Sequence, residues 1–346
     1  MQSNRITFSS CSAVAPAKTA ILSLLALLSV LSSLAQADDS AAYEWLGKMS
    51  RAAHELNYEG TFVYLHDKQL GSVRITHTVD ARGEREHLVA LNGAGREVIR
   101  DGSNVTCILP GSSAAIARTH SRKSFPGAVS DSIGELGKYY SFSLAGQERV
   151  AGRPSQRIIV RPKDSYRYGY HLSLDQETAL LLKADMVNER QTPLEQVMFT
   201  TINLNPRSAA AQSGADDEAQ QDAEGSENKP AMTTIQEREI SIPITTDKEW
   251  KVNWLPEGFQ IVEHNKYLMP RSNAPVEHMV FSDGLASVSV FIEKFDPGVK
   301  LEGASRKGAV NAYGTVIHEH QVTVMGEVPQ NAVKLIGQAV RHEDGR

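Results

Sequence analysis

The side chains that could do chemistry in this chain are its cysteine, histidine, serine and acidic residues, and their spacing matches no catalytic motif. Cys107 lies within an alternating segment, in phase with Val105 and Leu109, which indicates a buried, inert thiol rather than the nucleophile of a Cys–His protease. The sequence has no G-x-S-x-G motif for a Ser–His–Asp hydrolase. It also lacks a glycine-rich phosphate loop between a strand and a helix. We therefore predict that the chain is not an enzyme.

The histidines suggest a metal site only weakly. His318 and His320 would share one face of a strand and could supply two ligands, but no H-E-x-x-H motif or third spaced ligand accompanies them. The remaining histidines of interest are scattered along the sequence and fit ordinary surface or core positions: His54, His66, His77 and His87. We expect no metal ion and no cofactor.

The elements around these residues begin with a run of short strands over residues 58–111. The alternation predicts strands at 59–66, 70–79 and 84–91, followed by two strands that flank Asp101-Gly102, a strong hairpin signal. Every connection is short, so the strands must be sequential antiparallel neighbours. The segment carries no recognisable catalytic group.

Both faces of the first predicted strand are apolar. Phe62 and Tyr64 point one way, whereas Thr61, Val63 and Leu65 point the other way. A sheet with one face in water alternates more cleanly, so either both faces are packed or one faces an apolar cavity.

An amphipathic helix over residues 40–57 supplies one covering layer for this sheet. Trp45 on this helix could contact a ligand, but we favour a role as a core anchor between helix and sheet.

The rest of the first half predicts a long antiparallel sheet with few helices. Residues 112–128 indicate a mobile surface loop, and residues 129–140 a short helix. Four basic side chains in the loop either contact phosphate or carboxylate groups or are simply solvated, which we favour: Arg118, His120, Arg122 and Lys123. Further strands are expected at 155–161, 167–174, 179–188 and 194–204.

The first 37 residues are typical of a cleaved secretory signal peptide. Two basic residues precede an uncharged apolar core that is shorter than the roughly 20 residues of a membrane span, and an A-x-A site ends at Ala37. The chain has a formal net charge of −5, and loss of this leader makes it −7, which gives no case for nucleic-acid binding. Cys107 then has no intramolecular disulfide partner.

The second half divides into a linker and a smaller domain. Residues 208–234 are acidic, rich in Ala, Gln and Ser and free of aromatic residues, which predicts a flexible linker after a first domain at 38–207. Residues 235–346 indicate a smaller α+β domain. Its expected elements are strands at 235–244, 260–268, 276–282, 286–294 and 316–325 and a helix at 331–340, with an extended, turn-rich segment at 250–259.

Several long blocks resemble the MucB/RseB family of periplasmic negative regulators of the envelope-stress sigma factor. The resemblance covers the whole predicted mature chain. The blocks are YEGTFVYLH (58–66), REHLVALNGAGREVIRDG (85–102), YGYHLSLDQETALLLKADMVNERQTPLEQVMFT (168–200), WLPEGF (254–259), FSDGLASVSVFIE (281–293) and VMGEVPQNAVKLIGQAV (324–340).

The resemblance implies an α+β, mostly β chain whose large domain is a curved, unclosed antiparallel sheet covered by helices, like that of the lipoprotein carriers LolA and LolB. It also implies a periplasmic protein that binds the periplasmic region of a MucA/RseA-type transmembrane anti-sigma factor. That binding would protect the anti-sigma factor from proteolysis until a lipid or lipopolysaccharide-type stress signal releases it. A homo-oligomer is compatible with this role.

Strand parity and this resemblance together give candidate sites. We expect Phe62, Tyr64, Leu91, Tyr168 and Tyr170 to line a lipid cavity, although core packing explains each equally well. In the second domain we expect a partner or interdomain surface, formed by Trp254 and Phe259.

We hypothesise that a lipid shifts a closed, partner-binding arrangement of the domains toward an open one, which requires different lipid affinities in the two states. Two other functions remain open. One is a lipid or lipoprotein carrier, although a simple carrier has no need of the second domain. The other is an envelope hydrolase, which would lose its activity on Cys107→Ala substitution or chelation.

Overall fold

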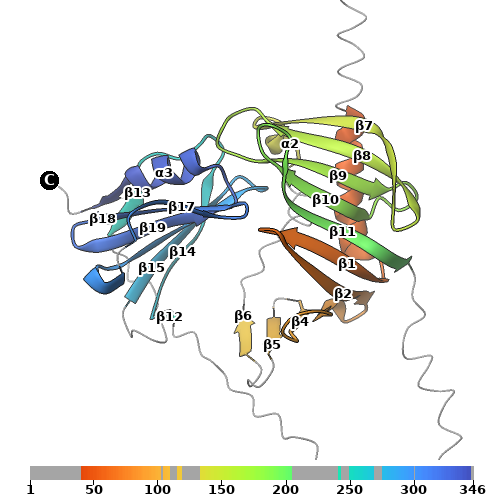
Figure 1. Ribbon diagram of the computed structural model, residues 1–346, viewed down its shortest axis with the longest axis horizontal. Helices are drawn as coiled ribbons and strands as arrows, with labels where there is room; N and C mark the ends of the chain where they lie inside the picture. Colours follow the sequence, from red (N-terminus) through yellow and green to blue (C-terminus); the bar gives the residue numbers. More distant parts are fainter. Residues whose placement is uncertain are drawn as a thin grey trace, which may run out of the picture.

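A computed structural model describes most of the chain as two β-rich parts lying side by side (Figure 1). The described residues are 40–102, 104–109, 115–118, 133–204, 241–242, 249–268, 275–299 and 301–343. The predicted signal peptide and the predicted linker at 208–234 lie outside these ranges, so both stay predictions, as do the domain boundaries drawn from them. Among the described residues, no helix has the length and apolar character needed to cross a membrane.

The first part is one antiparallel sheet of 11 strands in the order β6-β5-β4-β3-β2-β1-β11-β10-β9-β8-β7. Neighbours in the sheet are neighbours in sequence except at its centre, where β1 pairs with β11. The sheet does not close, because β6 and β7 are its edges. The strands are β1 (Tyr58–His66), β2 (Gln69–Asp80), β3 (Gly83–Ala90), β4 (Glu97–Asp101), β5 (Asn104–Ile108), β6 (Ala115–Arg118), β7 (Tyr140–Val150), β8 (Arg153–Pro162), β9 (Gly169–Asp175), β10 (Leu181–Val187) and β11 (Pro193–Leu204).

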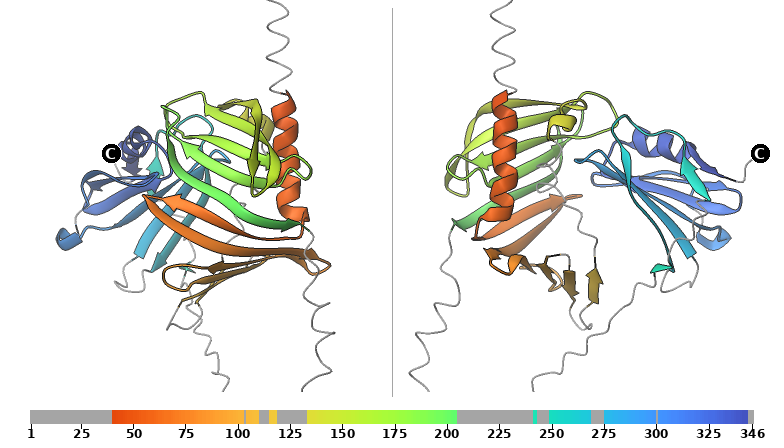
Figure 2. Two further views of the ribbon diagram at one scale, coloured as in Figure 1. Left: turned by 45° about the vertical axis from the view of Figure 1, so that its right-hand side comes forward. Right: turned by 180° about the vertical axis from the view of Figure 1, so that it is seen from behind.

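One long helix packs on what we call the inner face of this sheet (Figure 2). It covers residues 40–55, and its buried stripe, which includes Leu46 and Met49, contacts a core that contains Ile158 and Leu172. Helical spacing on one element and alternation on the other therefore bury a common core. Trp45 is a partly buried member of this core, as expected of an anchor. A one-turn helix, α2 (Ile133–Leu136), precedes β7.

The second part is a seven-stranded antiparallel sheet covered by one helix, α3 (Gln330–Gln338). Its core lies between the sheet and α3, where Val333 and Ile336 are fully buried. Pro329 immediately precedes α3, a position that its fixed φ suits. The strands are β12 (Ser241–Ile242), β14 (Gln260–Leu268), β15 (Pro275–Ser282), β16 (Ser287–Lys294), β17 (Gly303–Lys307), β18 (Val310–Ile317) and β19 (His320–Gly326), with a 3-10 turn η3 (Pro297–Val299) and a separate pair, β13 (Trp250–Val252) and β20 (Val340–His342).

The predicted fold class is confirmed: the chain is mostly β, with an unclosed sheet crossed by a helix and a smaller second sheet. Four local predictions are wrong. The strand β7 was missed, and Tyr140 belongs to it rather than to a helix at 129–140. The predicted loop at 112–128 contains β6. The predicted single strand at 316–325 is a hairpin of β18 and β19, so His318 and His320 do not share a strand face. The strands β13, β17 and β20 were not anticipated.

Candidate functional site

The inner face of the large sheet continues past the N-terminal helix as a half-exposed apolar surface. The registers place Ile75 opposite Leu88, Leu88 opposite Val98, and Val98 opposite Cys107. Directly paired residues share a face, so this row runs outward from the core across β2 to β5. Ile75 is 8% exposed, whereas the residues beyond it are only half-buried, because the helix does not extend over that end of the sheet.

We call this surface the open strip. The strands β3 to β5 carry apolar side chains at alternate positions, and the N-terminal helix covers the inner face only as far as β2. Their inward apolar side chains therefore stay accessible. Apolar area that stays accessible on a curved sheet suits a lipid chain or an apolar segment of a partner. The open strip consists of Tyr64, Val73, Leu88, Val98, Val105 and Cys107.

Two of the predicted cavity residues lie at this surface. Tyr64 is 40% exposed, and its ring covers Gly71 on the neighbouring strand. Phe62 is half-buried and packs edge-on against Phe199 at 5.8 Å between ring centroids, at the boundary between the core and the open strip. The register places Leu91 beside Ser72, opposite in face to Phe62, so we do not include Leu91 in the strip.

The other two predicted cavity residues, Tyr168 and Tyr170, lie in the covered core and not on the open strip. Both are 7% exposed in the cluster beneath the N-terminal helix. Tyr168 also reaches the second part of the chain, because its Oη accepts a hydrogen bond of 2.9 Å from Nδ2 of Asn311. The same amide group donates to the carbonyl of Val328 at 2.7 Å.

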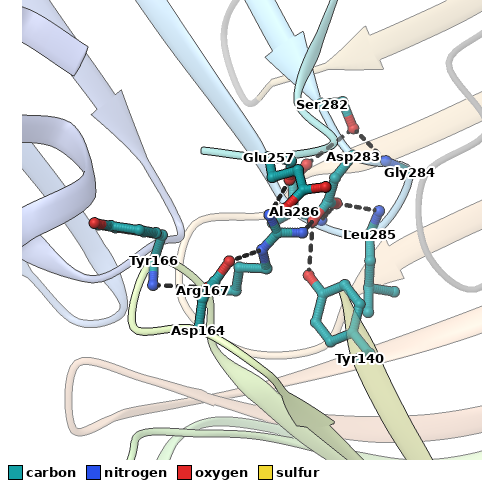
Figure 3. A network of polar contacts seen from close by, with 10 residues as sticks. All are labelled: Tyr140, Asp164, Tyr166, Arg167, Glu257, Ser282, Asp283, Gly284, Leu285 and Ala286. Carbon is teal, nitrogen blue, oxygen red and sulfur yellow. Dashed lines mark hydrogen bonds and ion pairs between the residues drawn. The ribbon is translucent and has the colours of Figure 1, made fainter. Parts of the chain in front are cut away.

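One contact between the two parts is a fully buried ion pair, centred on Arg167 (Figure 3). The guanidinium group of Arg167 donates to Oδ2 of Asp283 at 2.8 Å, and both side chains are fully buried. Its Nε donates to Asp164 at 3.1 Å. A third donor contacts the carbonyl of Glu257, so the buried charge has several partners.

The turn that contains Asp283 holds its carboxylate in the orientation that the ion pair needs. It lies between β15 and β16, where its Oδ1 accepts the backbone N–H groups of Leu285 and Ala286 at 2.8 and 2.7 Å. Its Oδ2 accepts from Arg167 and, at 3.0 Å, from the phenol of Tyr140. Burial, and then the charge of Asp283, raise the pKa of Tyr140 well above its ordinary value, so the phenol stays protonated and donates.

The segment WLPEGF supplies the opposite wall of this junction. Trp254 is 37% exposed and packs edge-on against Tyr166, with 5.3 Å between the ring centroids. Phe259 is 6% exposed and lies 5.1 Å from the guanidinium carbon of Arg167. The structure thus places Trp254 and Phe259 against the first part of the chain, and a role in binding a partner stays a prediction.

Gly258 lets the two parts approach closely. Its φ of +88° is in the region that favours glycine, and the ring of Tyr139 lies over it. A Cβ atom at this position would come within 2.3 Å of that ring.

A second polar contact joins β1 and β11 to the turn between β17 and β18. Oε1 of Glu195 lies 2.6 Å from Nδ1 of His66 and accepts the backbone N–H of Ala309 at 3.4 Å.

Sequence analysis missed Arg167, Asp283 and Asn311 as functional residues. Arg167 is 116 positions from Asp283, and Tyr168 is 143 positions from Asn311. Contacts over such distances produce no motif that can be recognised in the local sequence.

The described residues also contain one group of His and Glu side chains with the spacing of metal ligands: His77, Glu84 and Glu86. Burial acts to raise the pKa of the Glu84 carboxyl group. Contacts with His77 and His54 outweigh it and hold that pKa below its usual range. Two of the histidines expected at ordinary surface or core positions, His54 and His77, share this one carboxylate.

Comparison with known proteins gives two family matches and a set of full-length relatives. The model of the MucB/RseB N-terminal domain matches residues 41–224, and that of the MucB/RseB C-terminal domain matches residues 245–341. The sigma factor AlgU regulatory protein MucB of Pseudomonas aeruginosa is 31% identical and aligns over 93% of this chain and 97% of its own. The sigma-E factor regulatory protein RseB of Haemophilus influenzae is 29% identical over 92% and 96%.

Solved structures agree with these matches. The complex structure of Pseudomonas aeruginosa MucA/MucB is similar with a TM-score of 0.67 and 30% identity, over 88% of this chain and 99% of that one. A crystal structure of MucB in complex with MucA(peri) gives 0.65 and 29%, over 87% and 99%. These relatives are named as regulatory proteins and not as enzymes.

Proposed function

Because this chain belongs to the MucB/RseB family, we propose that it is a periplasmic regulator that binds the periplasmic region of a MucA/RseA-type anti-sigma factor. Bound there, it protects the anti-sigma factor from regulated proteolysis. The observation that carries this proposal is the similarity over nearly the full length to MucB solved with MucA. The predicted signal peptide supports a periplasmic location.

The open strip supports a second component of the proposal, which is release by a lipid-type signal. A half-buried apolar row on β2 to β5 offers area to an acyl chain, at about 25 cal/mol per Å² of apolar surface removed from water. The buried Arg167–Asp283 pair and the contacts of WLPEGF hold the two parts in one arrangement. A ligand that binds this arrangement and an alternative one with different affinities shifts the balance between them.

Binding to the periplasmic region of Pseudomonas aeruginosa MucA tests the first component. We expect saturable binding by the chain that begins at Asp38, together with slower cleavage of the MucA region by added protease. A lack of measurable binding, with lipid found in the purified protein, would instead favour a lipid or lipoprotein carrier that uses the same open strip.

Two adjacent residues of β4 give a matched test of the second component. Val98 belongs to the open strip, whereas Ile99 is its neighbour on the opposite face and is also half-buried. We expect Val98→Asp to abolish binding of a lipid A fragment and Ile99→Asp to retain it, since only the first places a charge on the proposed lipid surface. Equal losses in both variants would count against the open strip as the lipid site.

A further inference from the structure

A cluster of histidine and glutamate side chains lies where the N-terminal helix ends over the β2–β3 hairpin. His77 on β2 is directly opposite Glu86 on β3, so their side chains share the inner face. Glu84, two residues before Glu86, lies on that face as well. His54 comes from the last turn of the helix, and the cluster thus joins two elements distant in sequence.

The hydrogen bonds of His77 direct one of its ring nitrogens at the carboxylate of Glu84. The ring is 0% exposed, and its Nδ1 lies 2.7 Å from the carbonyl of Leu56, which can only accept, so Nδ1 carries the proton. In the neutral ring Nε2 is then a bare acceptor. It faces Oε1 of Glu84 at 3.2 Å, so the lone pair of this nitrogen and a carboxylate oxygen face the same small volume.

A metal cation bound between these atoms would take the place of the proton that the His77–Glu84 contact otherwise needs. One ligand atom each from His77, Glu84 and Glu86 lies within 4.8 Å of the others. Zinc binds histidine nitrogen and carboxylate oxygen at about 2.0–2.2 Å, which makes the edge of its tetrahedron roughly 3.4 Å. The distance of 3.2 Å between Nε2 of His77 and Oε1 of Glu84 is close to that edge.

The surrounding groups resemble the outer shell of a metal site. The carbonyl of Leu56 orients His77, as a backbone carbonyl commonly does for a ligating histidine. Arg100 holds Oε2 of Glu86 at 2.8 Å, and Nδ1 of His54 holds Oε2 of Glu84 at 3.0 Å. Nε2 of His54 is buried and has no hydrogen-bond partner among the described residues.

We propose that Nε2 of His77 and the carboxylates of Glu84 and Glu86 bind one Zn²⁺ ion, with His54 orienting Glu84. A mixed nitrogen and oxygen donor set suits zinc, whereas calcium and magnesium prefer oxygen alone. The ion ties the end of the N-terminal helix to the β2–β3 hairpin, at the margin of the open strip. No sequence motif indicates this site, because the ligands meet only across a strand pair.

Calorimetric titration of the untagged chain from Asp38 with zinc chloride, after treatment with a chelator, tests the proposal. We expect one saturable site of micromolar affinity or better. Glu84→Gln and Glu86→Gln should each weaken it by at least about tenfold. Cobalt should give visible absorption bands in the wild type that both variants lack, and far-UV circular dichroism checks that the variants fold.

A matched control lies on the opposite face of the sheet, on the neighbouring strands β3 and β4. His87 and Glu97 form an exposed pair at 3.0 Å with no third ligand described nearby, so Glu97→Gln should leave zinc affinity unchanged. If the wild type shows no saturable binding, the proposal is wrong. Binding that survives Glu84→Gln/Glu86→Gln but is lost on replacement of His318, His320 and His342 would place the metal elsewhere and also overturn it.

Discussion

At the scale of single residues, the junction depends on one buried charge pair. Arg167 and Asp283 are fully buried, and each has additional partners, which offset the cost of removing both charges from water. A buried pair of this kind specifies one arrangement of two surfaces more than it adds net stability, because each partner left alone is strongly unfavourable.

The pair therefore predicts strong coupling in a double-mutant cycle. Asp283→Ala alone should lower the free energy of unfolding by roughly 3–5 kcal/mol, because it leaves the Arg167 charge buried. Adding Arg167→Met should recover part of that loss. Urea denaturation followed by tryptophan fluorescence measures both effects, and strictly additive losses would contradict the coupling.

Gly258 provides a second prediction at this scale. Gly258→Ala should destabilise the junction by more than about 1 kcal/mol, since the new Cβ atom meets Tyr139 and the positive φ is strained. Gly93→Ala is the matched control, with a φ of +75° and no atom within 4 Å of the new Cβ. Thermal unfolding compares the two, and an equal fall in Tm would show that close approach at Gly258 is unimportant.

How far individual residues could be predicted depends on whether their environment is local. Strand parity correctly placed Phe62 and Tyr64 on one face, because alternation is a property of the strand itself. It could not show that Tyr168 and Tyr170 lie beneath a helix, since cover comes from elsewhere in the fold. Arg167 begins a predicted strand at 167–174, but its buried partner Asp283 is 116 positions away and could not be inferred from local alternation.

At the scale of elements, the N-terminal helix determines which part of the inner face is core and which is open. Its buried stripe packs over β7 to β10 and, through Ala52, over Tyr58 of β1 and Ile75 of β2, and the open strip begins where that cover ends. Elements with clear signals were predicted within a few residues, among them β14 with its bounds at Gln260–Leu268. The hairpin of β18 and β19 was not, because His318 and Glu319 adopt positive φ values of 45° and 59° where Asn-Gly would be expected.

The packing of this helix can be tested with one core and one surface substitution. Leu46→Ala should lower the free energy of unfolding by about 2–5 kcal/mol, because Leu46 is 1% exposed and its truncation leaves a cavity. Glu44→Ala on the exposed side should change it by less than about 0.5 kcal/mol. Chemical denaturation measures the free energy of unfolding of both variants. A small effect of Leu46→Ala would mean that the helix is only loosely packed on the sheet.

At the scale of the whole molecule, two β-rich parts meet through contacts whose partners come from many elements. The Arg167 network, the Tyr168–Asn311 bond and the Glu195–Ala309 contact lie at separate places along the junction. Interfaces between domains that contain several polar contacts resemble the interfaces of transient protein complexes. We therefore expect the two parts to move relative to each other. The proposed lipid release requires that motion.

A chemical cross-link across the junction tests the need for motion. Ser165 and Asn331 are joined by a hydrogen bond of 3.2 Å, and cysteines at both positions in a Cys107→Ser background can be bridged by a short bismaleimide. The bridged protein should bind the MucA region with an affinity that no longer changes with lipid. The same variant without the reagent is the control, and a full lipid response after bridging would exclude domain opening as the mechanism.

The most direct test of the central claim is the affinity of the chain for the periplasmic region of an anti-sigma factor, measured at increasing concentrations of a lipid A fragment. Linked equilibria predict that saturating lipid weakens this affinity by at least about fivefold, within the usual range of coupling between two sites. Val98→Asp should remove the effect while leaving the lipid-free affinity intact. An affinity that stays constant up to lipid saturation in the wild-type protein would contradict the account.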